Sequence, residues 1–123
     1  MKKKILVVDD ELVMVNLLKD LFVENGYDVI TAMSGPDGII RAKDENPDLI
    51  ILDINMPGMF GCAMSEVLKE IERTRHIPII FLTGFLDEED AEELKHELAG
   101  HCLLTKPFDN EELLAKVREA ISK

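Results

Sequence analysis

Residues 4–11 read KILVVDDE, and this segment determines which architecture the rest of the chain can form. Its apolar run, residues 5–8, is continuous and does not alternate with polar residues. Such a run is typical of a parallel strand that is covered on both faces of a sheet. Similar apolar runs follow along the chain at residues 29–32, 49–52, 79–82 and 103–104. We therefore expect five parallel strands.

Helix signals separate these apolar runs. Capping residues precede most of the intervening segments, and glycine or proline ends them. The expected helices span residues 10–26, 34–47, 61–74, 87–100 and 109–121. The clearest capping patterns are Ser34 with Asp37 and Asp109 with Glu112. Strict alternation of strand and helix predicts an α/β fold with a doubly wound sheet. In such a sheet the functional crevice lies outside the carboxyl ends of the strands.

Length, charge and cysteine content limit the function classes. We expect a single domain, residues 1–123, without an output domain in this chain. The 25 acidic residues outnumber the 14 basic ones, and the net charge of -11 disfavours binding to nucleic acid or to an anionic membrane. Cys62 and Cys102 lie too far apart in the sequence to indicate a zinc site or disulfide scaffold. The first apolar run is too short for a signal peptide, so we expect a cytoplasmic location.

Polar residues follow four of the apolar runs. Asp9 and Asp10 follow the first run, Asp53 the third, Thr83 the fourth and, shortly after its end, Lys106 the fifth. Taken singly, each has an ordinary interpretation as a helix cap, a turn residue or a surface charge. Because parallel strands end at one edge of the sheet, we expect three carboxylates, a hydroxyl and an ammonium group to meet there.

This combination of groups has a chemical meaning. Neighbouring carboxylates repel one another unless a cation lies among them. Oxygen ligands suit a hard divalent ion, above all Mg2+, which shares its coordination shell with water and phosphate oxygens. Lys106 offers a charge for an anion, and Thr83 offers a hydrogen bond. An aspartate in such surroundings can act as a nucleophile toward phosphoryl groups.

Four motifs, in this order and at this spacing, resemble the receiver domain of bacterial two-component response regulators. They are KILVVDDE at residues 4–11, DINMPGM at 53–59, LTG at 82–84 and TKPF at 105–108. The resemblance covers essentially the whole chain. Within the family, the chain resembles single-domain members similar to chemotaxis regulators. It implies a flavodoxin-like, doubly wound sheet of five parallel strands in the order 2-1-3-4-5, with five helices.

The resemblance also implies a role for each acidic residue. Asp53 would accept a phosphoryl group from a histidine kinase or a histidine phosphotransfer domain. Asp10 and Asp53 would bind Mg2+ through their carboxylates, Asn55 through its backbone carbonyl and Asp9 through a water molecule. The chain would then be a signalling switch and not an enzyme, apart from promoting its own phosphorylation and dephosphorylation.

Further roles follow from the same resemblance. Thr83 and Lys106 would contact the phosphoryl oxygens, with a cis peptide bond at Pro107 that aims Lys106 inward. The side chains of Asn55 and Phe85 would tune the rate of hydrolysis. Phosphorylation would change the surface of the fourth and fifth strand-helix units, which a downstream protein would recognise. The chain would act as a monomer or as a phosphorylation-linked dimer.

Two positions depart from the family pattern. Leu103 stands where many receivers carry tyrosine or phenylalanine, and we expect an ordinary core leucine there. Phe60 stands where an aspartate is common. Phe108 and the exposed part of the first helix, around Val13 and Asn16, are the expected contacts for the phosphodonor.

Two other functions are alternatives to the switch. A phosphatase with an aspartyl nucleophile could use the same kind of sheet. It would need a second carboxylic acid two residues after the nucleophile, where this chain has the amide Asn55. A pure interaction module would normally lack one of the key groups, and all of them are present in this sequence.

Overall fold

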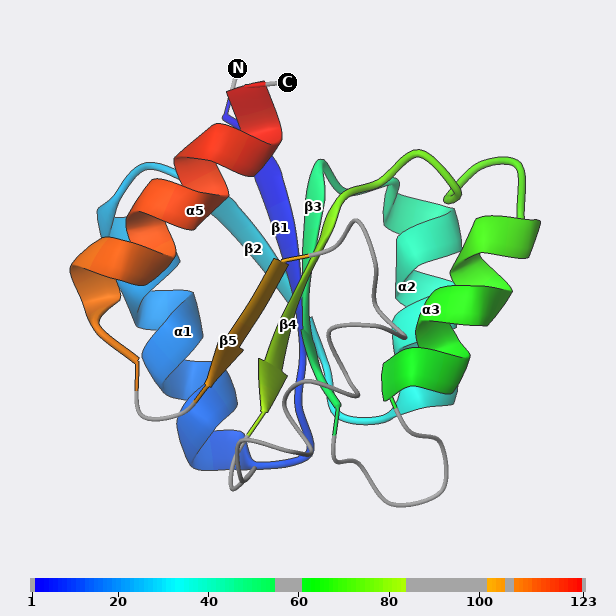
Figure 1. Cartoon of the computed structure of the whole chain (residues 1–123), viewed down its shortest axis with the longest axis horizontal. Helices are drawn as coiled ribbons and strands as arrows, with labels where there is room; N and C mark the ends of the chain where they lie inside the picture. The colour runs from blue at the N-terminus through cyan, green and yellow to red at the C-terminus, as the bar shows by residue number, and fades with distance from the viewer. Residues whose placement is uncertain (1, 55–60, 84–101, 106–107, 123) are drawn as a thin grey trace.

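The computed structural model describes residues 2–54, 61–83, 102–105 and 108–122. Across these ranges, five parallel strands form one sheet in the order β2-β1-β3-β4-β5 (Figure 1). The strands are β1 (Lys4–Val8), β2 (Asp28–Ala32), β3 (Leu49–Asp53), β4 (Ile79–Thr83) and β5 (Cys102–Thr105). The predicted strand positions, parallel direction and strand order are confirmed.

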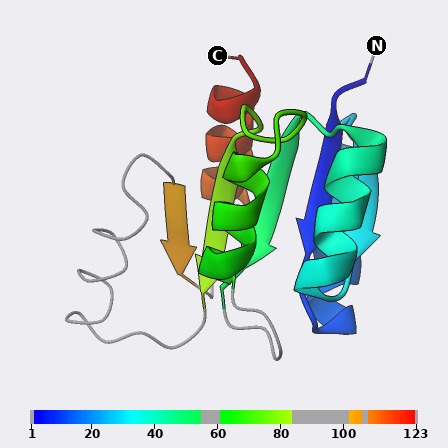
Figure 2. The same ribbon diagram turned by 90° about the vertical axis from the view of Figure 1, so that its right-hand side faces the viewer.

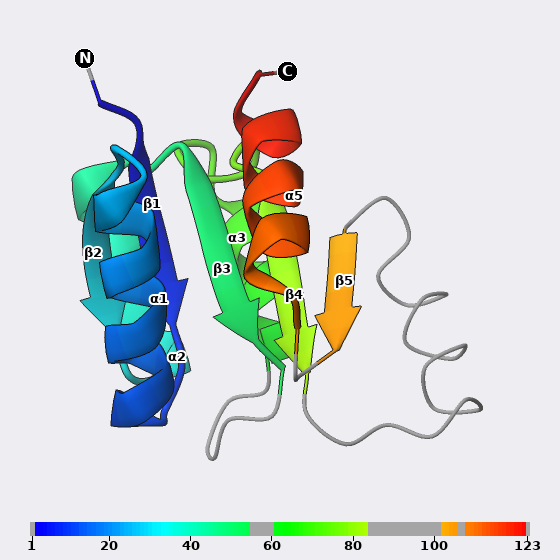
Figure 3. The same cartoon turned by 90° about the vertical axis from the view of Figure 1, so that its left-hand side faces the viewer.

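Helices cover both faces of this sheet, as predicted. The described helices are α1 (Leu12–Glu24), α2 (Gly35–Glu45), α3 (Gly61–Glu70) and α5 (Asn110–Ser122). Figure 2 views the face covered by α2 and α3, and Figure 3 views the opposite face, covered by α1 and α5. The predicted helix at residues 87–100 lies outside the described residues. None of the helices in the described ranges has the length and hydrophobicity to cross a membrane.

The interior strand β1 explains why the apolar runs are continuous. Ile5 and Val7 pack in the core cluster formed with α1 and α5, while Leu6 and Val8 pack in the cluster formed with α2 and α3. Burying one such side chain contributes roughly 1.5–3 kcal/mol relative to leaving it in water. A strand with two buried faces has no place for a polar side chain, so polar residues are confined to its ends.

The start of α2 is capped as predicted and is tightly packed. The Ser34 hydroxyl accepts a hydrogen bond from the Asp37 N–H at 3.2 Å, which satisfies one of the unpaired donors of the first turn. At Gly38, a Cβ would lie only 2.8 Å from Met64 Cε and 3.0 Å from Val8 Cγ2. The absence of a side chain at Gly38 therefore lets α2 lie close to both β1 and α3.

The end of α3 differs from the prediction. The helix ends at Glu70 and not at about Thr74, and the chain turns at residues 71–77. The Thr74 hydroxyl donates a hydrogen bond to the Leu68 carbonyl at 2.6 Å. The Thr74 N–H donates to the Ile71 carbonyl at 3.0 Å. A side-chain bond such as that of the Thr74 hydroxyl competes with helical hydrogen bonding. The predicted extension of this helix to about Thr74 is therefore wrong.

The other helix ends agree more closely with expectation. α5 starts after Asp109, as predicted, but the Asp109 carboxylate accepts a hydrogen bond from the Glu111 N–H at 3.1 Å and not from Glu112. α1 starts after Glu11, whose side chain makes no capping bond to the helix. α1 ends just before Gly26, whose φ of 91° is one that glycine adopts readily.

Candidate functional site

The candidate site lies at the carboxyl ends of β1 and β3. Val8 is paired with Leu52, so Asp9, which directly follows β1, and Asp53, the last residue of β3, lie side by side. The Asp9 N–H donates a hydrogen bond to the Ala32 carbonyl at 3.2 Å, which continues the sheet bonding past the end of β1. The chain moves outward from β1 to β2 and in the other direction from β3 to β4, so this is the topological switch point of the sheet.

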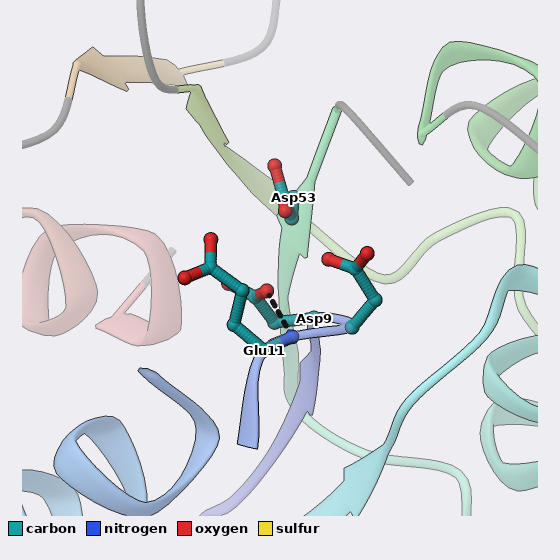
Figure 4. A group of neighbouring side chains, drawn as sticks. Asp9, Glu11 and Asp53 are labelled. Carbon is teal, nitrogen blue, oxygen red and sulfur yellow. Dashed lines mark hydrogen bonds between the residues drawn. The ribbon is translucent and has the colours of Figure 1, made fainter. Parts of the chain in front are cut away.

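Four acidic side chains gather at this point. Asp9, Asp10, Glu11 and Asp53 each offer a carboxylate oxygen, and these oxygens lie within 4.8 Å of one another. Asp9 and Asp53 are buried, with 1% and 4% of their surface exposed, whereas Glu11 is exposed. Figure 4 shows Asp9 and Glu11 on the segment that follows β1, with Asp53 coming from the end of β3. The structure brings together the three predicted aspartates.

The sequence prediction did not include Glu11 among the site residues. The only sequence signal that could have identified Glu11 as a site residue was its position directly after the aspartate pair. The Glu11 N–H donates a hydrogen bond to Asp9 Oδ1 at 3.0 Å, drawn as a dashed line in Figure 4. The Glu11 carbonyl accepts the Val15 N–H at 3.0 Å, which begins α1. These two bonds fix the backbone of Glu11 beside the aspartates, a consequence of the local turn that residue type alone does not reveal.

The charge of this cluster determines what it can bind. Carboxylates this close repel one another, and the burial of Asp9 and Asp53 adds a cost of desolvation. A divalent cation among them would offset both costs. A donor set made only of oxygens, two of them held in place by burial, fits a hard ion such as Mg2+.

Thr83 lies on the same edge of the sheet. It is the last residue of β4 and is fully buried. Asp53 is paired with Leu82, so Thr83 lies one residue further along the carboxyl edge, on the strand next to β3. The Ile54 N–H donates to the Leu82 carbonyl at 3.0 Å, which ties the end of β3 to that of β4. The predicted hydroxyl is therefore on the strand that adjoins the carboxylates.

Other predicted site residues fall into two groups. Those outside the described residues are Asn55, Phe60, Phe85, Lys106 and Pro107. Leu103, the departure from the usual aromatic residue, lies in β5, where its backbone pairs with Phe81. The roles predicted for these residues stay predictions.

The residues expected to contact a phosphodonor have different surroundings. Val13 is 73% exposed on α1, and Asn16 on the same helix is also exposed. Leu12 and Leu17, both more than half exposed, extend this apolar surface. Phe108 is only partly exposed and packs against the core cluster of α1 and α5. The exposed apolar surface therefore starts on α1 directly after the acidic cluster.

Known proteins have this architecture. The family model for the response regulator receiver domain matches residues 5–118. Among solved structures, the chemotaxis protein CheY4 of Vibrio cholerae aligns with a TM-score of 0.86 and 29% sequence identity. That alignment covers 98% of this chain and 99% of the CheY4 chain.

Two similar curated proteins are longer than this chain. The alkaline phosphatase synthesis transcriptional regulatory protein PhoP of Bacillus subtilis is 43% identical over 119 residues, which are 96% of this chain and 48% of PhoP. The response regulator PleD of Caulobacter vibrioides is 41% identical over 118 residues, which are 96% of this chain and 26% of PleD. This chain thus spans about half the length of PhoP and about a quarter of PleD. With a match to the family model over nearly its full length, the chain belongs to the response regulator receiver domain family.

Proposed function

We propose that this chain is a phosphorylation-dependent signalling switch in which Asp53 accepts a phosphoryl group from a histidine kinase or a histidine phosphotransfer domain. The observation that carries the proposal is the position of Asp53. It is buried at the end of β3, and carboxylate oxygens of Asp9, Asp10 and Glu11 lie within 4.8 Å of its own. In a receiver domain, this arrangement supports phosphoryl transfer to one positioned carboxylate.

Mg2+ is the cation that we propose for this site. Asp10 and Asp53 would hold it through their carboxylates, Asn55 through its backbone carbonyl and Asp9 through a water molecule. The indirect role fits Asp9, because one of its carboxylate oxygens already accepts the Glu11 N–H at 3.0 Å. When bound, the ion would neutralise charge on the phosphoryl oxygens.

The proposed transfer needs few protein groups. An oxygen of Asp53 attacks the phosphorus of a phosphohistidine, and a P–O bond forms while the P–N bond breaks and its electron pair leaves with the imidazole. The product is an aspartyl phosphate. Water later attacks the phosphorus, which restores the carboxylate and releases inorganic phosphate. Because Asp53 is buried, access of that water is restricted, and this favours a phosphorylated form that persists between the two steps.

The signal would leave the site through the adjoining strands. Thr83 and Lys106 would contact the phosphoryl oxygens, and the side chains of Asn55 and Phe85 would tune hydrolysis. Phosphorylation adds about -1.5 to -2 charges, which the cation and Lys106 would offset. Thr83 is fully buried at the end of β4, so any movement toward the phosphoryl group would require repacking around it. That repacking would alter the surface of the fourth and fifth strand-helix units, which a downstream protein would recognise. In this change, Leu103 would stand where many receivers have an aromatic ring.

The exposed apolar side chains of α1 support a docking role beside the site. Val13 and Leu17 are one helical turn apart and therefore lie on the same side of α1. Leu12 follows Glu11 directly, so this surface adjoins the acidic cluster that contains Asp53. We propose that the histidine-bearing phosphodonor covers these side chains when it presents its phosphoryl group.

Mg2+ is expected to raise the melting temperature, because the ion binds the folded site and not the unfolded chain. At ten times its Kd, the ion adds about 1.4 kcal/mol to the free energy of unfolding. For a chain of this size, that corresponds to a rise of about 5 °C. Scanning calorimetry measures the rise, with KCl at matched ionic strength as the control. Asp53→Asn should lose most of it, and an unchanged melting temperature in millimolar Mg2+ would contradict the cation site.

Phosphorylation by acetyl phosphate is expected to require both Mg2+ and Asp53. Intact mass spectrometry should detect one phosphoryl adduct on the wild type and none on Asp53→Asn. Asp48→Asn is the matched control, because Asp48 precedes β3 at its other end, where its carboxylate accepts the Lys4 N–H at 2.9 Å. That variant should be phosphorylated like the wild type. An adduct of equal yield on Asp53→Asn would show that another residue is the acceptor.

Val13→Glu is expected to slow phosphotransfer from a histidine kinase or phosphotransfer domain that phosphorylates the wild type. A charge within an apolar contact should cost about tenfold in rate. Val23→Glu, near the other end of α1 and also exposed, is the control and should have little effect. Both variants should react normally with acetyl phosphate, which needs no docking surface. Equal transfer rates for Val13→Glu and wild type would exclude this part of α1 as the docking surface.

A further inference from the structure

Ile54, the residue directly after Asp53, is held in place both by its side chain and by its backbone. Its surface is 5% exposed, and its N–H donates a hydrogen bond to the Leu82 carbonyl at 3.0 Å. We propose that Ile54 is a positioning residue, which fixes the direction of the Asp53 carboxylate and joins it to the end of β4. This inference rests on the proposed function of Asp53 and adds the residue that orients its carboxylate.

The side chains on either side of Asp53 pack in one core. Leu52 and Ile54 both belong to the buried cluster formed with α2 and α3. Successive side chains of an extended chain point to opposite faces, so these two anchors turn the Asp53 side chain away from that cluster. Val8 packs in the same cluster, which turns Asp9 in the same direction as Asp53. The core therefore sets both carboxylates on one side of the sheet.

The backbone of Ile54 connects the strand of Asp53 to the strand of Thr83. Asp53 is the last residue of β3 and is paired with Leu82. The bond from the Ile54 N–H to the Leu82 carbonyl continues this pairing one residue beyond β3. Thr83 follows Leu82 directly and is fully buried at the end of β4. Ile54 therefore ties the proposed phosphoacceptor to the strand that carries the proposed switch hydroxyl.

The substitution Ile54→Ala removes this anchor. It deletes buried atoms beside the site, and the surrounding core collapses only partly into the space that they leave. The backbone after Asp53 then has fewer contacts to hold it, so the carboxylate has more freedom to turn. A misplacement of about 1 Å between reacting groups can cost about a hundredfold in rate. We therefore expect Ile54→Ala to react slowly even while it remains folded.

Ile77→Ala is the matched control, because Ile77 is 4% exposed and packs in the same cluster as Ile54. Ile77 precedes β4, at the opposite edge of the sheet from Thr83. Both substitutions remove the same atoms from the same core, so they should lower the melting temperature by similar amounts. Ile54→Val is the conservative variant, since valine keeps the branched shape and most of the packing. Any difference in rate between Ile54→Ala and Ile77→Ala then reflects position.

The measurement is the rate of phosphorylation by acetyl phosphate at saturating Mg2+, followed by intact mass spectrometry. It is made well below the melting temperature of every variant, with circular dichroism to verify that each is folded. Ile54→Ala should react about ten- to a hundredfold more slowly than the wild type. Ile54→Val should recover most of the rate and lie within about threefold of the wild type, and Ile77→Ala within about twofold.

The role of Ile54 and the proposed function fail in different ways. A wild-type rate in Ile54→Ala, or an equal loss of rate in Ile77→Ala, would overturn the role of Ile54 while leaving the switch intact. If Ile54→Ala does not fold, Ile54→Val and Ile77→Val make the same comparison, and equal rates for these two would overturn the role. Failure of the wild type to gain a phosphoryl group would instead overturn the proposed function on which that role rests.

Discussion

Parallel strands that are buried on both faces impose the constraint on which the site depends. Each strand must be apolar along its length, so polar side chains that serve a function are confined to the ends. In this chain Asp9 directly follows the apolar residues of β1, and Asp53 is the last residue of β3. The pairing of Val8 with Leu52 places these two carboxylates side by side. The core and the site are therefore two results of the same pairing.

The carboxylates gathered in this way are a cost to the folded state and also the source of its chemistry. Burial of Asp9 and Asp53 beside Asp10 and Glu11 concentrates negative charge where water is scarce. A cation would relieve that cost, and we propose that it would thereby create a place where a phosphoryl group can be accepted. In the proposed function, opposed charges in one site would connect metal binding, phosphorylation and a change at the end of β4.

The strands and their order could be predicted from the sequence, because continuous apolar runs and strict alternation with helices leave few topologies. Ser34 was predictable as a helix cap because capping depends only on residues that are close together in the sequence. The early end of α3 was not, since it depends on a hydroxyl of Thr74 that reaches back to the Leu68 carbonyl. The inclusion of Glu11 in the site was also missed, because its placement follows from the geometry of the turn after β1 and not from its residue type. The roles of residues such as Asn55 and Lys106 rest on family resemblance alone.

We propose that Asp53 carries the phosphoryl group as an acyl phosphate. Borohydride reduces an aspartyl phosphate to homoserine and leaves a free carboxylate unchanged, so it marks the phosphorylated residue permanently. After brief reaction with acetyl phosphate and Mg2+, peptide mapping of the reduced protein should find homoserine at position 53 and aspartate at positions 9 and 10. Homoserine at another position, or none in a protein that has gained a phosphoryl group, would contradict the account.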